Sequence, residues 1–163
     1  MPVVTAELIN TVTINQVPMH VPLGASLPGW NGTEGTICGL EYQFKGKSVN
    51  RLEAKPSPAL IRSLTETWLN APYMRGGKTI FGVDCSGFVQ VNYKMMGIDL
   101  PRDAWQQAQE GKIVEKLKEA ACGDLAFFDD HDEIVHVGIL LSNETIIHAS
   151  GKVRIDQIDK KGI

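Results

Sequence analysis

One cysteine of this chain stands where its thiol could act as a nucleophile. Cys85 follows Asp84 and begins the run CSGFVQVNYKMM, in which apolar residues recur at helical spacing. A thiol at a helix N-terminus lies beside unpaired backbone N–H groups, at the positive end of the helix dipole. Both effects favour the reactive thiolate over the thiol. The alternative is that Cys85 is an inert buried residue, as we expect for Cys38 and Cys122, which lack such a setting.

Two histidines have the placement of a base and its partner. His136 lies in the apolar run EIVHVGILL and His148 in the next such run, TIIHAS. A thiol nucleophile needs a base to take its proton, and that base needs a partner that fixes its tautomer. If the turn between the two strands has an odd number of residues, as Ser142-Asn143-Glu144 would give, both imidazoles share one face. They would then lie opposite or diagonal to each other, roughly 4.5–8 Å apart.

A zinc site is the competing interpretation of the same three side chains. Cys85, His136 and His148 could be three ligands of a catalytic metal. The sequence lacks the closely spaced pair of ligands that most zinc sites contain, and a cysteine at a helix start suits a nucleophile better. We therefore expect no metal and no other cofactor.

The elements that must position these residues follow an order of helices before strands. Ser57 and Pro58 favour a helix start, and that helix should end near Asn70. The helix that begins at Cys85 should stop at Gly97. A third helix is expected over residues 102–110, followed by three strands in DLAFF, EIVHVGILL and TIIHAS. The pattern predicts an α+β domain in which helices and an antiparallel sheet are segregated.

The first part of the chain has a different texture. Residues 1–55 are rich in Val, Thr, Gly and Pro, with short alternating runs and frequent turn signals. This pattern predicts a small β-barrel. We therefore divide the chain into a β module over residues 1–56 and a catalytic domain over residues 57–163.

Charge and hydropathy limit the classes of partner. The net charge of −3 is spread along the chain, so a nucleic-acid partner is not expected. No apolar run reaches the length of a membrane span, and the N-terminus has no basic cluster before an apolar stretch. We expect a monomer, cytoplasmic as the sequence stands, or periplasmic or in the cell envelope if a leader has been removed.

The motifs taken together resemble a known family. The run PYMRGG…FGVDCSGFVQVNY…GIDLPRDAWQQ, followed by GDLAFFD, HVGIL and IIHAS, resembles the NlpC-type bacterial cell-wall cysteine peptidases. The match extends from about residue 60 to residue 151, with the motifs in the family's order. Residues 1–56 resemble, more loosely, the SH3-like module that often precedes this catalytic domain.

The resemblance implies a fold, an activity and a set of site residues. The domain would be papain-like, with Cys85, His136 and His148 as a catalytic triad. It would hydrolyse the bond between γ-D-glutamate and diaminopimelate or lysine in peptidoglycan stem peptides or released muropeptides, as in murein recycling. The resemblance also implies four substrate-binding residues: Tyr73, Asp84, Ser86 and Asp103.

Two other functions stay open on the sequence alone. One is a different cell-wall cysteine hydrolase, such as an amidase that cuts between muramic acid and L-alanine. The other is a non-catalytic module that only binds cell-wall peptides.

Overall fold

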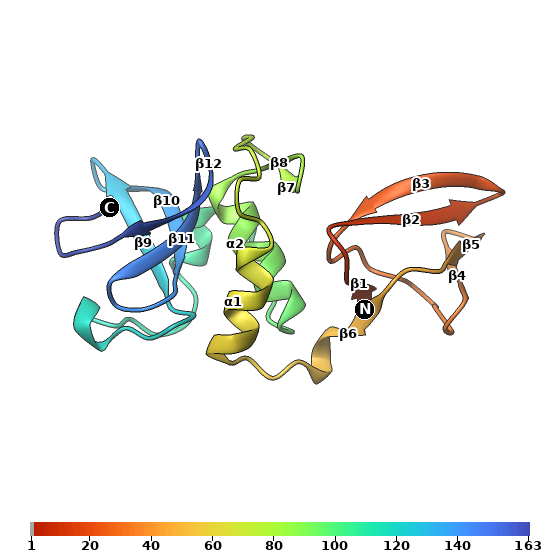
Figure 1. The fold of residues 1–163 in the computed structure, drawn as a ribbon, viewed down its shortest axis with the longest axis horizontal. Coiled ribbons are helices and arrows are strands. Elements are labelled where there is room, and N and C mark those ends of the chain that lie inside the picture. Colours follow the sequence, from red (N-terminus) through yellow and green to blue (C-terminus); the bar gives the residue numbers. More distant parts are fainter. Residues whose placement is uncertain (1) are drawn as a thin grey trace.

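The computed structural model describes residues 2–163, and from residue 57 onward its α-helices precede a four-stranded antiparallel sheet, as predicted. The sheet has the strand order β12-β11-β10-β9. In Figure 1 the helices α1 and α2 lie between this sheet and the strands of the N-terminal module. The elements are α1 (Pro58–Glu66), α2 (Cys85–Met95), α3 (Ala104–Gln107), β9 (Leu125–Asp130), β10 (Glu133–Leu140), β11 (Thr145–Ser150) and β12 (Lys152–Gln157).

Helix α2 begins and ends where the sequence predicts. Asp84 is its N-cap, and the Asp84 carboxylate accepts a hydrogen bond from the Gly87 N–H at 2.7 Å. Gly97 follows the helix at a φ of 80°, a conformation that glycine adopts without strain. The predicted inner face is buried, with Phe88 and Met95 at 0% and 5% exposure. The sequence therefore fixes both the limits and the rotation of the helix that carries Cys85.

The other two helices are shorter than predicted. Ser57 caps α1 as expected, but regular helix ends at Glu66, and turns carry the chain to Asn70. The third helix, expected over residues 102–110, covers only Ala104–Gln107. Asp103 accounts for its late start, because it is the N-cap and shares a capping box with Gln106.

Both faces of the sheet are covered. One face packs against α2 in the main core, where Val137, Ile139 and Ile147 are fully buried. The opposite face forms a smaller cluster around Leu140 and Ile146. The short helix η2 (Leu117–Glu119) contributes Leu117 to that cluster. Strands with apolar residues on both faces explain why these runs are almost continuously hydrophobic.

The N-terminal part forms a module of short strands. Four of them make a sheet in the order β3-β2-β5-β4, and β1 pairs with β6. A separate small core around Val12, Tyr42 and Phe44 supports this sheet. The expectation of several short strands is confirmed, whereas an SH3-like barrel stays a prediction. The strands are β1 (Val3–Thr5), β2 (Ile9–Ile14), β3 (Val17–Pro22), β4 (Glu34–Ile37), β5 (Leu40–Phe44) and β6 (Ser48–Asn50), followed by η1 (Arg51–Glu53).

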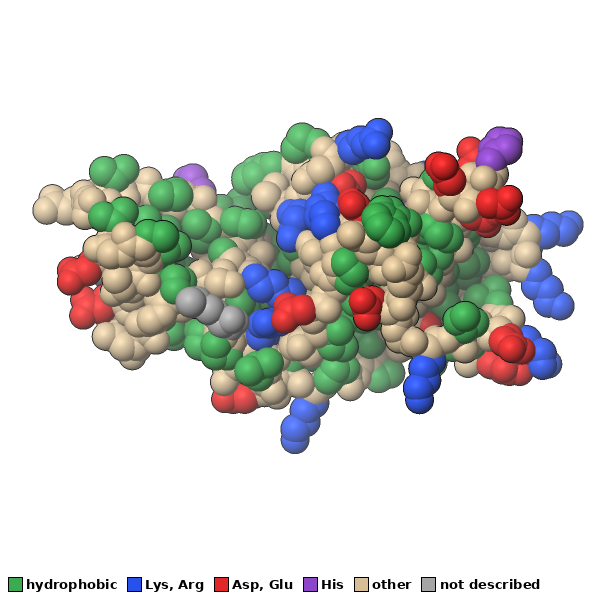
Figure 2. All heavy atoms as spheres, turned by 180° about the vertical axis from the view of Figure 1, so that it is seen from behind, with side chains coloured by type: hydrophobic (Ala, Val, Ile, Leu, Met, Phe, Trp, Pro, Cys, Tyr) green, Lys and Arg blue, Asp and Glu red, His purple; other side chains and the backbone are tan. Residues whose placement is uncertain are grey.

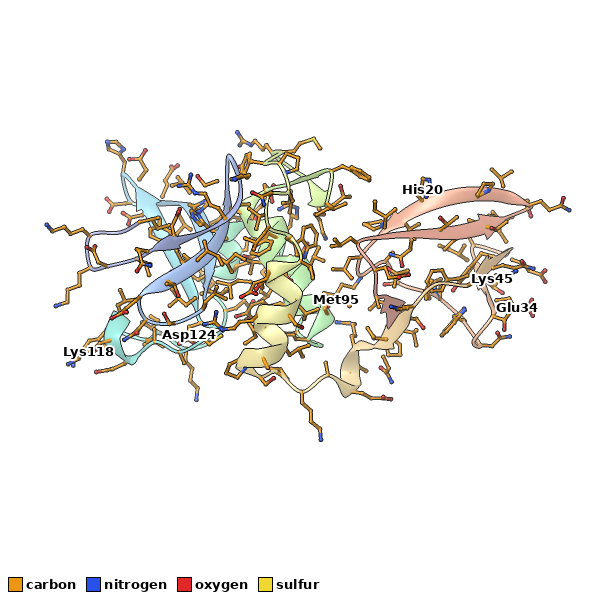
Figure 3. All side chains as sticks on the ribbon, viewed as in Figure 1. His20, Glu34, Lys45, Met95, Lys118 and Asp124 are labelled. Carbon is orange, nitrogen blue, oxygen red and sulfur yellow. The ribbon has the colours of Figure 1, made fainter. Side chains whose placement is uncertain are left out.

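The module packs directly on the C-terminal half of α2. Lys94 Nζ donates to the Gly24 carbonyl at 2.6 Å, and Met95, labelled in Figure 3, lies on the side of the helix that faces the module. Arg51 donates two hydrogen bonds to the Asp99 carboxylate, at 2.7 and 2.8 Å. Because buried side chains of the module also join the main core, the boundary at residue 56 stays a prediction.

Two further features concern the charge of the surface and the apolar length of the helices. Acidic and basic side chains are interspersed on the face drawn in Figure 2. Within residues 2–163, none of the helices has the length and apolarity that crossing a membrane would require.

Candidate active site

Cys85 is the first residue of α2 and is 7% exposed. Its thiol accepts hydrogen bonds from the backbone N–H groups of Val137 on β10 and of Ser86. Burial nevertheless raises the pKa of Cys85 above its ordinary value, and these N–H groups offset only part of that effect. The expectation that the helix start favours the thiolate is therefore wrong for the resting protein, because desolvation outweighs the favourable dipoles.

The structure brings the two predicted histidines into direct contact. His136 Nε2 lies 2.7 Å from His148 Nδ1. The two rings are nearly perpendicular, with an interplanar angle of 78° and centroids 5.0 Å apart. Leu141 donates to the Thr145 carbonyl at 2.9 Å, so three residues form the turn. The predicted odd turn and shared face are confirmed.

His136 rests as a neutral imidazole. Burial, together with the nearby His148 and Arg154, lowers the pKa of His136 to about 4. The ring of Phe128, its partner on β9, lies 5.8 Å away and contributes to the apolar surroundings. Because the pKa of Cys85 is raised as well, both groups are neutral near pH 7. The arrangement therefore suits proton transfer from thiol to imidazole during the reaction rather than a preformed ion pair.

Asp156, a carboxylate that the sequence analysis missed, lies next to the pair of histidines. Asp156 Oδ2 lies 2.9 Å from His148 Nε2 and 2.7 Å from Arg154 Nε. The hydrogen bonds from His148 and Arg154 lower the pKa of Asp156 against a smaller opposing effect of burial. Asp156 stands on β12, a strand that the sequence analysis did not predict. The alternation in KVRIDQ, with Val153 buried, was the available signal.

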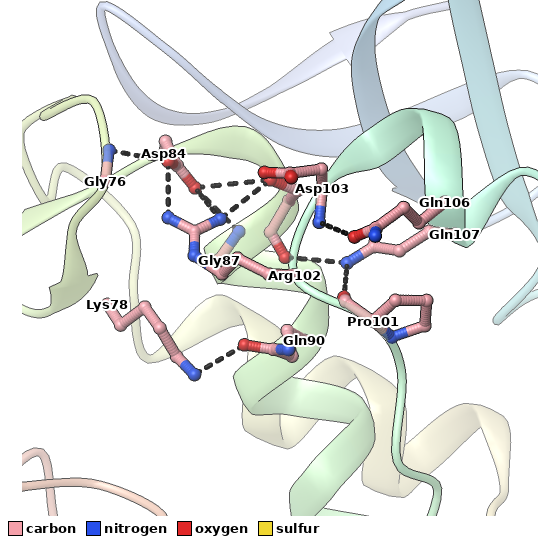
Figure 4. Close-up of polar contacts among 11 residues, drawn as sticks. Gly76, Lys78, Asp84, Gly87, Gln90, Pro101, Arg102, Asp103, Gln106 and Gln107 are labelled. Carbon is pink, nitrogen blue, oxygen red and sulfur yellow. Dashed lines mark hydrogen bonds and ion pairs between the residues drawn. The ribbon is translucent and has the colours of Figure 1, made fainter.

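A second polar cluster surrounds the residues beside the thiol (Figure 4). Arg102 donates to both carboxylate oxygens of Asp84, at 3.0 and 2.6 Å, and to Ser86 Oγ at 2.9 Å. The Asp84 carboxylate also accepts from the backbone of Gly76 and Gly87, each at 2.7 Å. Burial alone would raise the pKa of Asp84, but these donors outweigh it and lower the pKa. Asp84 thus fixes the loop that precedes Cys85.

The four residues expected to bind substrate differ in their surroundings. Tyr73 is 41% exposed, and its pKa is raised first by burial and then by Cys85 and Asp84. Asp103 is exposed at the N-terminus of α3. Ser86 and Asp84 are buried within the Arg102 cluster. Their contacts with substrate stay predictions.

The hairpin of β7 (Lys78–Thr79) and β8 (Gly82–Val83) leads into the helix that carries the thiol. Lys78 Nζ on β7 donates at 2.5 Å to Oε1 of Gln90 on α2.

Among residues 2–163, no group of three or more His, Cys, Asp or Glu side chains has a geometry that could hold a metal ion.

Comparison with known proteins identifies the family. The model of the NlpC/P60 family matches residues 70–163. A probable endopeptidase NlpC homolog of Haemophilus influenzae is 36% identical over 121 residues, which are 72% of this chain and 64% of that protein. The gamma-D-glutamyl-L-lysine dipeptidyl-peptidase of Bacillus subtilis is 40% identical over 117 residues, 70% of this chain and 39% of that protein. The chain thus spans less than two thirds of the length of either relative.

Solved structures agree with this assignment. An NlpC/P60 family protein from Bacillus cereus aligns with 98% of this chain and 59% of its own chain, at a TM-score of 0.79 and 24% identity. That likeness concerns the fold. The NlpC/p60 domain of the peptidoglycan hydrolase SagA covers 63% of this chain and 90% of its own, with a TM-score of 0.57 and 29% identity. The fold is that of the NlpC/P60 proteins. The chain belongs to the NlpC/P60 family.

Proposed function

We propose that the chain is a cysteine peptidase that hydrolyses the bond between γ-D-glutamate and the following diamino acid in peptidoglycan stem peptides or released muropeptides. The observation that carries the proposal is the contact of 2.7 Å between His136 Nε2 and His148 Nδ1, beside a buried cysteine at a helix start. The family and the names of its relatives, among them a γ-D-glutamyl-L-lysine dipeptidyl-peptidase, support this bond. The diamino acid is diaminopimelate or lysine.

Acylation uses the thiol and one histidine. His148 occupies Nε2 of His136, so Nδ1 is the nitrogen that remains to accept the Cys85 proton. As that proton moves to Nδ1, the sulfur attacks the γ-glutamyl carbonyl carbon. The resulting imidazolium returns the proton to the amine of the diamino acid, which leaves as the carbon–nitrogen bond breaks. His148 holds the ring of His136 in orientation throughout.

Hydrolysis of the thioester reverses these roles. Nδ1 of His136 takes a proton from water, whose oxygen attacks the thioester carbonyl. The carbon–sulfur bond then breaks, and the proton returns to the Cys85 sulfur. In both steps the negative charge that develops on the carbonyl oxygen needs donors. The Cys85 backbone N–H at the start of α2 and the Tyr73 hydroxyl would supply them.

Substrate recognition is assigned to groups around the thiol. Ser86 and Asp84 would shape the wall of the cleft beside Cys85, and their hydrogen bonds with Arg102 hold them in place. The exposed carboxylate of Asp103 would hold the free amino end of the peptide. The stem peptide would therefore be accepted from its L-alanine end.

Mass spectrometry of L-Ala-γ-D-Glu-diaminopimelate and of its lysine analogue tests the proposal. The wild-type protein should release L-Ala-γ-D-Glu from at least one of them, and Cys85→Ala should release none. Asp130→Asn, an exposed change at the end of β9, is the control and should behave as wild type. If both tripeptides survive, or if Cys85→Ala still cleaves them, the proposal is wrong. Cleavage of a muramoyl peptide before L-alanine would instead identify an amidase.

A further inference from the structure

Four polar side chains form a row across three neighbouring strands. His136 on β10 contacts His148 on β11, and His148 contacts Asp156 on β12. Arg154, directly opposite His148 in the strand register, contacts the same carboxylate. His148 is 2% exposed, whereas Asp156 stands on the edge strand of the sheet. The row therefore runs from the half-buried His136, through the buried His148, to a charge near the surface.

Hydrogen-bonding chemistry fixes the protons in this row, starting at its outer end. Arg154 Nε can only donate, so Asp156 Oδ2 must accept from it. The same oxygen faces His148 Nε2 at 2.9 Å, and an anionic carboxylate accepts there too. His148 Nε2 therefore carries a hydrogen. In a neutral imidazole the other nitrogen, Nδ1, is then an acceptor.

The same reasoning gives the tautomer of His136. With neutral His148 accepting at Nδ1, His136 Nε2 is the donor of the 2.7 Å contact. Neutral His136 then has an unprotonated Nδ1, the form that can take a proton from a thiol. If His148 Nδ1 donated to His136 Nε2 instead, neutral His136 would carry its hydrogen on Nδ1 and could not take a proton from the thiol there.

We infer that Asp156 is a positioning residue of the active site, which sets the tautomer of His148 and, through it, the tautomer of His136. Arg154 supports it by donating to the same carboxylate oxygen. The inference rests on the proposed function, because it assigns His136 the role of base for Cys85. It extends the predicted row of three residues to a fourth that no sequence motif indicated.

Nitrogen-15 NMR of the imidazole rings tests the inference on the unmodified protein. At pH 7, above the lowered pKa of His136, both His136 and His148 should carry their hydrogen on Nε2. In Asp156→Asn the amide can donate to His148 Nε2, so we expect the Nδ1–H form of His148 to become populated. An Nδ1–H form of either ring in the wild type would overturn the inference. This readout uses the wild-type protein, so it does not depend on whether a variant folds.

Alkylation of Cys85 by iodoacetamide gives a second test that needs no substrate. It is measured at pH 7 with Cys38 and Cys122 changed to Ser, so that only Cys85 reacts. Asp156→Asn should slow alkylation about 10- to 100-fold, by analogy with the loss when the hydrogen-bond partner of a metal-bound histidine is removed. Asp130→Asn should leave the rate unchanged, and Asp156→Glu should recover part of it.

The two proposals can fail separately. Folded Asp156→Asn protein that alkylates at the wild-type rate would overturn the role of Asp156, whatever peptide the enzyme cleaves. Slow alkylation with the expected tautomers would support that role even if both stem tripeptides survive. In that case only the proposed substrate would be wrong.

Discussion

A Cβ atom built on Gly138 of β10 would lie 2.8 Å from the Cβ of His148 on β11. Real Cβ atoms do not approach so closely, and Ile146 blocks the same space, with its Cδ1 at 2.6 Å. Only glycine therefore fits opposite His148. The glycine of the HVGIL segment thus has a packing reason to be there.

Replacing this glycine should damage activity more than folding. In Gly138→Ala we expect His148 to move away from His136, and a displacement of about 1 Å can cost roughly 100-fold in rate. Overpacking should also lower the free energy of unfolding by about 1–3 kcal/mol. Peptide cleavage and urea denaturation measure the two effects. Val135→Ala, an exposed change on the same strand, is the control, and an active Gly138→Ala variant would contradict the prediction.

Activity should persist to an unusually low pH. His136 must be neutral to accept the thiol proton, and burial lowers its pKa to about 4. Activity should therefore persist below pH 6.5 and fall only as the pH approaches about 4. The limb is measured as kcat/KM against pH, with circular dichroism at each point to show that the protein is folded. A midpoint near 6.5 would show that His136 is not held neutral by its surroundings.

Stability should follow pH in the same direction. His136 has a lower pKa in the folded protein than the ordinary value of 6.5, so between pH 6.5 and 4 the unfolded chain binds more protons. The lowered pKa of Asp156 acts in the same direction at lower pH, from its ordinary value of 3.8 downwards, because protonating its carboxylate breaks contacts made only when folded. The free energy of unfolding should thus decrease as the pH falls through both ranges. In His136→Gln the decrease should be smaller, as measured by urea denaturation at each pH.

The Arg102 cluster should not tolerate even a conservative substitution. Arg102→Lys keeps the charge but loses the paired hydrogen bonds to Asp84, whose side chain is 10% exposed. We expect a loss of about 1–3 kcal/mol in the free energy of unfolding and a higher KM, because Ser86 loses its anchor. Lys116→Gln removes an exposed ion pair with Glu119 and should cost less than about 1 kcal/mol. Equal losses in the two variants would refute the role given to Arg102.

The ion pair between Arg51 and Asp99 should contribute modestly to stability. Asp99→Asn removes the charge that the two Arg51 hydrogen bonds reach, but Asp99 is 70% exposed. We therefore expect a loss of about 1 kcal/mol and faster proteolysis between residues 54 and 57, with the peptidase activity of the folded protein retained. Thermal unfolding and limited proteolysis measure these effects, and unchanged cleavage of the segment would contradict the prediction.

Local patterns were enough to predict much of the catalytic half. The capping residues Ser57 and Asp84, the stop at Gly97 and the odd turn between β10 and β11 all follow from rules that act within a few residues. They predicted that the thiol begins a helix and that the two histidines share one face. The third helix begins later than expected because Asp103 is its cap, and residues 108–110 form a turn and a bend instead of regular helix.

The sequence by itself determined which residues could react and which elements carry them, because helix caps, strand alternation and turn parity depend on near neighbours in the chain. Tertiary structure alone decided the electrostatics. The raised pKa of Cys85 reflects burial against β10, which outweighs the local helix dipole. Asp156 reaches His148 only because β12 pairs with β11. Burial and contacts across strands depend on the packing of distant segments, so no local pattern could reveal them.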